Sequence, residues 1–234
     1  MVKRTWLILC LLMLLALPLS ARAELPWQFD QHTRYMALGD SLVAGYGAVP
    51  ATQGYVYLLY QSGVFDTVPN ALLCNAGVPG ATSSDVVNYQ VPQAVRAFPP
   101  TGPTVITITV GGNDLLSILT GADPTTVFTD FQKNLAKILF TLRTSLPDTK
   151  VYISNLYTVS KVQDADEAVA KMNYIISQTA LAFDVPVADV YSAFKGKEGY
   201  LLITRRGASE YEVHPTNAGY RAMAKAFEEV ILKK

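Results

Sequence analysis

The chain has 234 residues, half of them hydrophobic, and carries 19 basic and 19 acidic side chains. This balance argues against nucleic acid as a partner, because phosphate binding requires clustered lysine and arginine. The chain has two histidines, two cysteines and no acidic cluster at ligand spacing, so it predicts no metal site, and we expect no cofactor.

Residues 1–23 have the three parts of a secretory signal peptide. Lys3 and Arg4 form a positive region, residues 6–17 form an apolar run, and Ala21-Arg22-Ala23 is a small-x-small cleavage site. The apolar run is shorter than the roughly 20 residues that a membrane-spanning helix needs. We therefore predict an exported protein, periplasmic or extracellular, with no stable membrane anchor after cleavage. A retained amino-terminal anchor is the alternative interpretation.

The mature chain, residues 24–234, has the length of one domain with a sizeable core. It carries 16 basic and 19 acidic residues, because the signal peptide removes three basic residues. Cys74 is its only cysteine, so the mature chain forms no intramolecular disulfide and its fold depends on the core. We expect Cys74 to be a buried small hydrophobic residue.

Strand and helix patterns alternate along the mature chain. Runs of strand-forming residues predict five strands, at 34–38, 71–75, 104–110, 150–155 and 185–190. Apolar spacing and start signals predict helices, most clearly at 124–146, and also at 55–60, 83–89, 166–183 and 218–232. Residues 191–212 are less regular. Alternating strands and helices form βαβ units, so the sequence predicts a parallel sheet covered on both faces.

Three predicted strands lead into residues suited to acyl chemistry, namely Ser41, Gly80 and Asn113. Right-handed connections bring the carboxyl ends of parallel strands to one edge of the sheet, where ligands bind in such folds. A serine becomes a nucleophile when a base accepts its proton, and a glycine N–H and an asparagine amide can stabilise the oxyanion that forms. Taken alone, each residue also fits an ordinary turn or helix cap.

His214 is the candidate base. It lies just before the last predicted helix, and Pro215 favours an extended backbone at His214, which would hold the imidazole in a loop over the sheet edge. His32, the other histidine, precedes the first predicted strand and has no such framing. We therefore rank His32 far below His214.

Four blocks of the sequence resemble the SGNH, or GDSL, hydrolases, in the order and spacing of that family. The blocks are Gly39-Asp40-Ser41-Leu42, Asn75-x-Gly77-x-x-Gly80-x-Thr82, Gly112-Asn113-Asp114 and His214-Pro215. Residues 39–46 look like the bacterial exported lysophospholipase, thioesterase and arylesterase branch. The resemblance implies a flavodoxin-like, three-layer α/β/α sandwich with a mostly parallel sheet of about five strands, formed by residues 24–234 as one domain.

The resemblance also implies a role for each matching residue. Ser41 would be the nucleophile and His214 the general base. The oxyanion hole would consist of the Ser41 and Gly80 backbone N–H groups and the Asn113 side-chain amide.

One position departs from the family pattern. The family has an aspartate three residues before the histidine, which orients the imidazole and stabilises its charged form. Here that position is Tyr211, flanked by Glu210 and Glu212. Three interpretations follow: a dyad of Ser41 and His214 with the ring held by a main-chain carbonyl, a triad completed by one of the glutamates, or a protein without activity. We favour the first two, because the other matching residues are present.

We expect a serine esterase that cleaves short to medium acyl esters of small molecules through an acyl-enzyme on Ser41. A deacetylase or thioesterase on the same site is one alternative. An inactive SGNH domain that binds glycan or lipid is an alternative of another class. The resemblance further implies that Asp40 and Asp114 are structural hydrogen-bond partners rather than proton carriers.

Overall fold

The computed structural model describes residues 32–65, 71–99, 101–159, 165–204 and 211–233. These residues belong to one compact unit, His32–Lys234. The predicted signal peptide, residues 1–23, and the candidate acid Glu210 lie outside the described residues. In the described part of the chain, no helix has the length and apolar character needed to cross a membrane.

Five parallel strands in the described residues form one sheet, in the order β2-β1-β3-β4-β5. They are β1 (Arg34–Gly39), β2 (Leu72–Asn75), β3 (Val105–Thr109), β4 (Lys150–Ser154) and β5 (Val187–Ala188). The parallel register, in which Gly39 of β1 pairs with Thr109 of β3, brings the carboxyl ends of the strands to one edge. The predicted parallel sheet of about five strands is confirmed.

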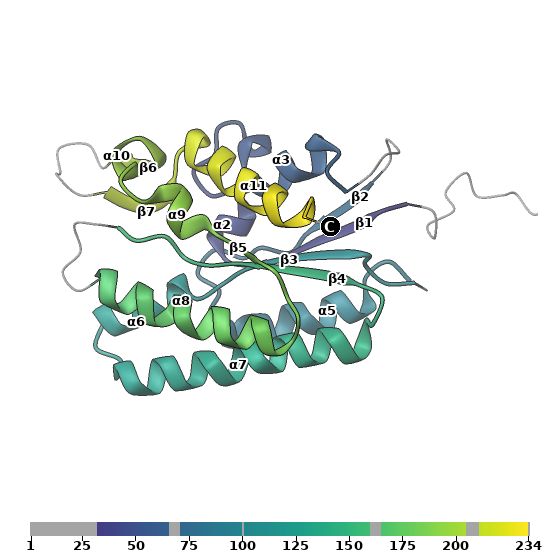
Figure 1. Cartoon of the computed structure of the whole chain (residues 1–234), viewed down its shortest axis with the longest axis horizontal. Helices are drawn as coiled ribbons and strands as arrows, with labels where there is room; N and C mark the ends of the chain where they lie inside the picture. The colour runs from purple at the N-terminus through teal and green to yellow at the C-terminus, as the bar shows by residue number, and fades with distance from the viewer. Residues whose placement is uncertain (1–31, 66–70, 100, 160–164, 205–210, 234) are drawn as a thin grey trace, which may run out of the picture. The chain divides into compact units, whose positions relative to one another are not determined.

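Helices cover both faces of this sheet (Figure 1). The first layer contains α5 (Val91–Arg96), α6 (Gly112–Leu119), α7 (Pro124–Ser145) and α8 (Ala165–Ala182), and the second contains α2 (Ser41–Ala44), α3 (Tyr55–Ser62), α9 (Val190–Phe194) and α11 (Asn217–Ile231). In β1, Met36 and Leu38 pack into the first core, whereas Tyr35 and Ala37 pack into the second. A strand buried on both faces is the pattern of a parallel sheet, and the predicted three-layer sandwich is confirmed.

Local sequence explains the longest helix, α7. The Asp123 side chain caps its amino end by accepting a hydrogen bond from Thr126 N at 2.8 Å, and Pro124 fits the first turn. Phe131, Leu135 and four further apolar residues at helical spacing are buried against the sheet. Because the cap and the apolar spacing are both visible in the sequence, the helix agrees with the predicted range 124–146 to within one residue.

Two strands differ from their predicted form. The fifth strand has two residues, Val187 and Ala188, because the Asp189 side chain caps α9 and ends the extended segment. The second strand, β2, lies at the edge of the sheet and all four of its residues are partly exposed. The expectation of a buried Cys74 is therefore wrong, since the thiol of this edge strand is only partly covered.

The segment after β5 contains more regular structure than its sequence predicted. It forms α9, α10 (Glu198–Leu201) and two strands, β6 (Leu202–Thr204) and β7 (Tyr211–Pro215). These strands pair antiparallel in a separate two-stranded sheet. The remaining short elements are η2 (Ala51–Gln53), α4 (Ser83–Asp85) and η3 (Val86–Gln90), the last of which is π-helical.

Candidate active site

Ser41 is the first residue of α2 and follows β1 after a sharp turn. Gly39 has φ of +143°, and a Cβ there would lie 1.9 Å from the carbonyl oxygen of Thr109, so this position requires glycine. Asp40 caps α2 by accepting a hydrogen bond from Leu42 N at 2.9 Å. The turn therefore presents the Ser41 hydroxyl at the carboxyl edge of the sheet.

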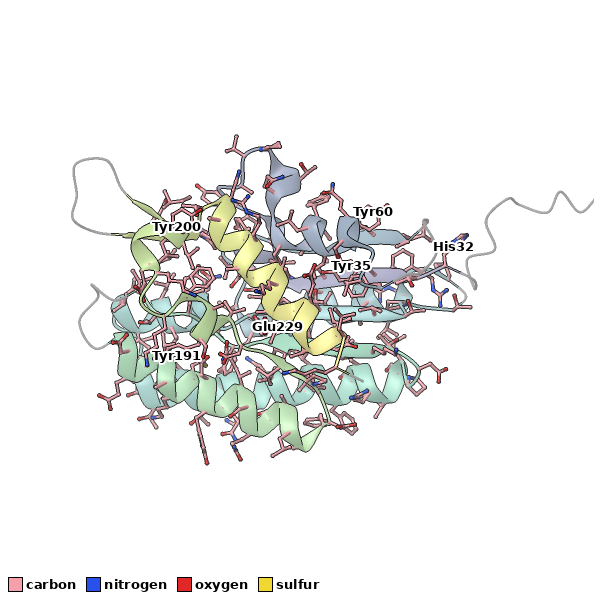
Figure 2. All side chains as sticks on the ribbon, turned by 45° about the horizontal axis from the view of Figure 1, so that its top comes forward. His32, Tyr35, Tyr60, Tyr191, Tyr200 and Glu229 are labelled. Atoms are coloured by element: carbon pink, nitrogen blue, oxygen red, sulfur yellow. The ribbon has the colours of Figure 1, made fainter. Side chains whose placement is uncertain are left out.

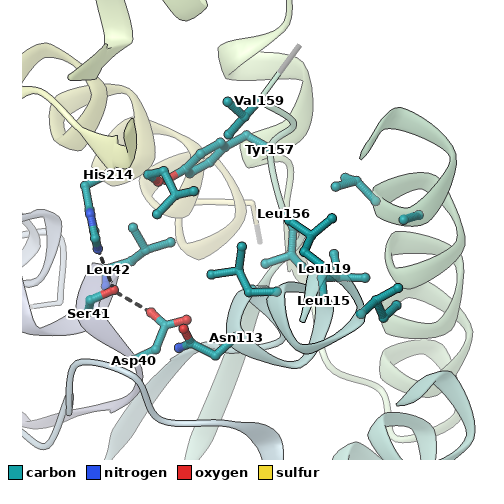
Figure 3. Close-up of a pocket in the computed structure, with 16 residues that line it drawn as sticks. Asp40, Ser41, Leu42, Asn113, Leu115, Leu119, Leu156, Tyr157, Val159 and His214 are labelled. Carbon is teal, nitrogen blue, oxygen red and sulfur yellow. Dashed lines mark hydrogen bonds between the residues drawn. The ribbon is translucent and has the colours of Figure 1, made fainter. Parts of the chain in front are cut away.

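The structure brings His214 to Ser41 across 173 residues of sequence, and His214 Nε2 lies 2.9 Å from Ser41 Oγ (Figure 3). His214 belongs to β7, the strand whose presence the sequence did not predict. His32 precedes β1 and lies at the opposite end of that strand from Ser41; Figure 2 shows it far from Tyr200 of α10. Of the two histidines, His214 alone contacts the serine in the described structure.

Aromatic side chains hold the segment around His214. The Tyr46 ring lies 4.4 Å from the imidazole, centroid to centroid, with a tilt of 41°. The Tyr157 hydroxyl donates a short hydrogen bond to the carbonyl of Val213, and its ring stacks on Phe194 at 4.3 Å. These contacts fix both the ring and the backbone that carries it.

The surroundings of His214 Nδ1 show which group could replace the aspartate that the family has at the position of Tyr211. Nδ1 is buried and has no hydrogen-bond partner among the described residues. Glu212 lies two residues before His214 in β7, whose pairing with β6 is irregular over this stretch. Burial lowers the pKa of His214, and the nearby Glu212 carboxylate opposes that shift by raising it. Glu212 thus acts on the imidazole electrostatically, whereas neither it nor any other described residue is hydrogen-bonded to Nδ1.

The turn at Gly80 is built for an exposed backbone N–H. Ala81 N donates to Val78 O at 3.0 Å, and Gly80 has φ of +85°, which is typical of a type II turn with Pro79 before the glycine. Asn113, the second residue of α6, donates one amide hydrogen to Ala81 O at 2.8 Å. Its second amide hydrogen is left for another acceptor. Asn113 and the Gly80 turn are thereby joined.

Two carboxyl groups, of the half-buried Asp114 and the buried Asp40, form hydrogen bonds at this edge. Asp114 accepts hydrogen bonds from Ser83 N at 3.0 Å and Ser83 Oγ at 2.6 Å, which ties α6 to the start of α4. Burial raises the pKa of Asp114, against the effect of the Ser83 bonds. Burial also raises the pKa of Asp40 to about 7, against the bond from Leu42 N, and the charge of Asp114 adds to the shift. Both carboxyl groups make the structural hydrogen bonds that the resemblance implied.

An apolar cavity of about 300 Å³ opens beside Ser41, Asn113 and His214. Its walls come from α6, from the loop after β4 and from α8 (Figure 3), and they include Leu115, Leu119, Leu156, Val159, Ala168 and Val169. Sequence reasoning did not single out these residues, because an apolar stripe on α6 or α8 has the same pattern whether it faces a core or a cavity.

Gln90 is a further residue that the sequence analysis did not single out. It is buried in η3, and its side-chain amide forms hydrogen bonds with both the N–H and the carbonyl of Gly39. A glutamine in the middle of an apolar helical stretch has no local signature of such a contact.

A serine and histidine in contact at the carboxyl edge of a parallel α/β sheet, beside an apolar cavity, are the features of a serine-type hydrolase. The GDSL-like lipase/acylhydrolase family matches residues 37–222. The chain belongs to this family and is a hydrolase that acts on ester bonds.

Individual relatives agree with this assignment. The chain is 31% identical over 210 residues to the spore germination lipase LipC of Bacillus licheniformis, which covers 82% of this chain and 93% of the relative. A lipolytic G-D-S-L family protein from Veillonella parvula is 26% identical, with a TM-score of 0.66 over 86% of this chain and 100% of that one. The lipase Lip_vut3 from a goat rumen metagenome is 27% identical, with a TM-score of 0.69 over 85% of this chain and 97% of the other.

Proposed function

We propose that the protein is a serine esterase that cleaves short to medium acyl esters of small molecules through an acyl-enzyme on Ser41. The observation that carries this proposal is the 2.9 Å contact between Ser41 Oγ and His214 Nε2 at the mouth of an apolar cavity. Burial keeps the pKa of His214 below its ordinary value, so the imidazole is neutral and can accept a proton at pH 7.

In the proposed reaction, Ser41 Oγ attacks the ester carbonyl carbon while its proton moves to His214 Nε2. The negative charge on the former carbonyl oxygen is bound by the N–H groups of Ser41 and Gly80 and by the free amide hydrogen of Asn113. Collapse of the tetrahedral intermediate expels the alcohol, which takes the proton from His214. Water then attacks the acyl-enzyme by the same route and releases the carboxylic acid.

We further propose that Glu212 stabilises the charged imidazole in place of the family's aspartate at position 211. The support is its place in β7, two residues before His214, and the direction in which its charge moves the pKa of His214. The Tyr46 ring can add to this stabilisation, because a cation is attracted to an aromatic face. Glu210, and a dyad of Ser41 and His214 whose Nδ1 donates to a main-chain carbonyl, are the competing proposals for this role.

The cavity is suited to binding the acyl group of the substrate. Its walls are apolar, and its volume is near the lower end of the range for small-molecule sites. An aliphatic chain gains free energy by leaving water for such walls, whereas an acetylated sugar would leave hydroxyl groups without partners there. This favours acyl esters over glycans, and a thioester with the same acyl group would use the same site. We also propose that residues 1–23 direct export to the periplasm or the cell exterior.

The proposal is tested by comparing the wild-type protein with Ser41→Ala and with Ser177→Ala, which changes an exposed serine of α8. A fluorophosphonate should label the wild type and Ser177→Ala but not Ser41→Ala. The wild type and Ser177→Ala should also turn over p-nitrophenyl esters and thioesters with acyl groups from acetyl to octanoyl, whereas Ser41→Ala should not. If Ser41→Ala kept its turnover, the proposed nucleophile would be wrong, and if no protein reacted, an inactive binding domain would be favoured.

A further inference from the structure

The backbone of Gly39 is linked to two of the proposed oxyanion donors, the N–H groups of Ser41 and Gly80. Gly39 lies two residues before Ser41, and its carbonyl accepts a hydrogen bond from Val78 N at 3.0 Å, at the start of the turn that presents Gly80. A shift of Gly39 would therefore move the Ser41 N–H and the Gly80 N–H together. What holds Gly39 in place determines the shape of the proposed oxyanion hole.

Gln90 forms hydrogen bonds with both backbone polar groups of Gly39. Gly39 N donates to Gln90 Oε1 at 2.7 Å, and Gln90 Nε2 donates to Gly39 O at 2.8 Å. The side chain is 2% exposed, so water does not compete for these bonds. Because β2 ends at Asn75, which lies opposite Ala37, the strand supplies no partner for Gly39 N. The amide of Gln90 takes the place of the missing strand neighbour.

The backbone that carries Gln90 is π-helical, which affects the direction in which the Gln90 side chain points. Residues Val86–Gln90 are π-helical between the α-helical segments α4 and α5. A π-helical turn inserts a residue and changes which side chains face inward, and such turns are frequent at functional sites. The same helical stretch begins at the Thr82 cap, directly after the Gly80 turn. Gln90 thus connects the helix that follows Gly80 with the strand end that precedes Ser41.

We infer that Gln90 is a positioning residue for ester hydrolysis, which fixes the Ser41 and Gly80 N–H groups relative to each other through the Gly39 peptide. This inference rests on the proposed function and adds a residue to it. Gln90 touches no substrate, so its loss should slow the chemical step and leave ground-state binding in the apolar cavity nearly unchanged. A misplacement of about 1 Å can slow catalysis by about a hundredfold, so a shift of the donors should lower the rate of the chemical step.

The test uses Gln90→Met, which keeps the length of the side chain and removes both hydrogen bonds. Gln90→Glu is the second variant, because burial favours the neutral carboxyl, which can still accept from Gly39 N and donate to Gly39 O. Thr149→Val is the matched control, since Thr149 is also buried and its hydroxyl donates to Pro103 O at 2.6 Å, before the amino end of β4 and away from the site. Thermal unfolding followed by circular dichroism is used to choose an assay temperature at which each protein is folded.

We expect kcat on p-nitrophenyl butyrate to fall about tenfold to a hundredfold in Gln90→Met, and less in Gln90→Glu, with KM within about threefold of the wild-type value. The rate of fluorophosphonate labelling at Ser41 should fall in parallel. Thr149→Val should lower the melting temperature and keep kcat. If Gln90→Met kept kcat, if KM rose instead, or if both Gln90 variants failed to fold, the positioning role would be overturned. A wild-type protein that fails to react at Ser41 would instead refute the proposed function.

Discussion

The two halves of the candidate catalytic pair are held in different ways. Ser41 lies on a turn that is fixed by hydrogen bonds at Gly39 and Asp40 and by a close approach to Thr109. His214 lies on a two-stranded sheet outside the main one and is held by aromatic contacts, with Nδ1 buried and unpartnered in the described residues. The nucleophile side follows the family pattern, and the base side carries the departure at Tyr211. The serine side therefore has more hydrogen-bonded support than the histidine side among the described residues.

Removing the base should have the largest effect on activity. We expect His214→Ala to lower kcat/KM by about 10⁴-fold or more, because Ser41 then has no group to accept its proton. The variant should stay folded, since the imidazole is only partly buried. Turnover of p-nitrophenyl butyrate measures the loss, with His32→Ala as the matched control. A comparable loss in His32→Ala would contradict the assignment of the base.

Asn113→Ala should come next and tests the nucleophile side. Removing one oxyanion donor typically lowers the rate about a hundredfold to a thousandfold. The Asn113 amide also donates to Ala81 O, so a small loss of stability should accompany the kinetic effect. Steady-state kinetics combined with thermal unfolding separates the two. A loss of activity that disappears when the variant is measured well below its melting temperature would assign Asn113 a structural role only.

Glu212→Gln sharpens the base side, and we expect kcat to fall between a few-fold and about tenfold. The Glu212 carboxylate raises the pKa of His214, so its neutralisation should lower that pKa. The imidazole must be neutral to act as a base, so the acidic limb of the pH–rate profile should move to lower pH. Glu210→Gln is the matched control and should leave the profile in place, whereas Tyr211→Asp should move the limb to higher pH. A profile that moves with Glu210→Gln would transfer the role to Glu210.

Ala168→Phe tests the cavity wall that sequence reasoning missed. The larger ring would fill part of the cavity of about 300 Å³. We expect the ratio of kcat/KM for octanoyl over acetyl esters to fall about tenfold, because each methylene excluded from an apolar site costs binding free energy. Leu181→Phe, on the exposed side of α8, is the control. An unchanged ratio would show that the acyl group does not enter this cavity.

Tyr157→Phe should have the smallest effect of these variants. It removes the hydrogen bond to the carbonyl of Val213 and keeps the stacking on Phe194. We expect a loss of about 1 kcal/mol of folding free energy and a few-fold fall in kcat. Chemical denaturation and steady-state kinetics measure the two effects. A fall in kcat larger than that of Asn113→Ala would mean that the base side is the more demanding half.

The same contrast explains how much of the molecule was predictable. The five strands and the residues at their carboxyl ends could be located from local patterns. A strand is rich in branched residues, and a turn with positive φ has a glycine, so both are visible in the sequence. The pair of β6 and β7 leaves little mark, because its two strands are short and their pairing is irregular. Gln90 and the cavity wall were missed for a related reason. A buried amide or an apolar stripe shows what it contacts only once the chain is folded.

The contact between Ser41 and His214 spans 173 residues and has a consequence for how activity arises during synthesis. A growing chain contains Ser41 long before it contains His214, which lies in β7 just before the last helix, α11. Under the proposed mechanism, ester hydrolysis therefore requires the carboxyl-terminal segment that carries His214 to be in place beside Ser41. A chain that stops before residue 214 has the proposed nucleophile without its proposed base, and we expect it to leave esters intact.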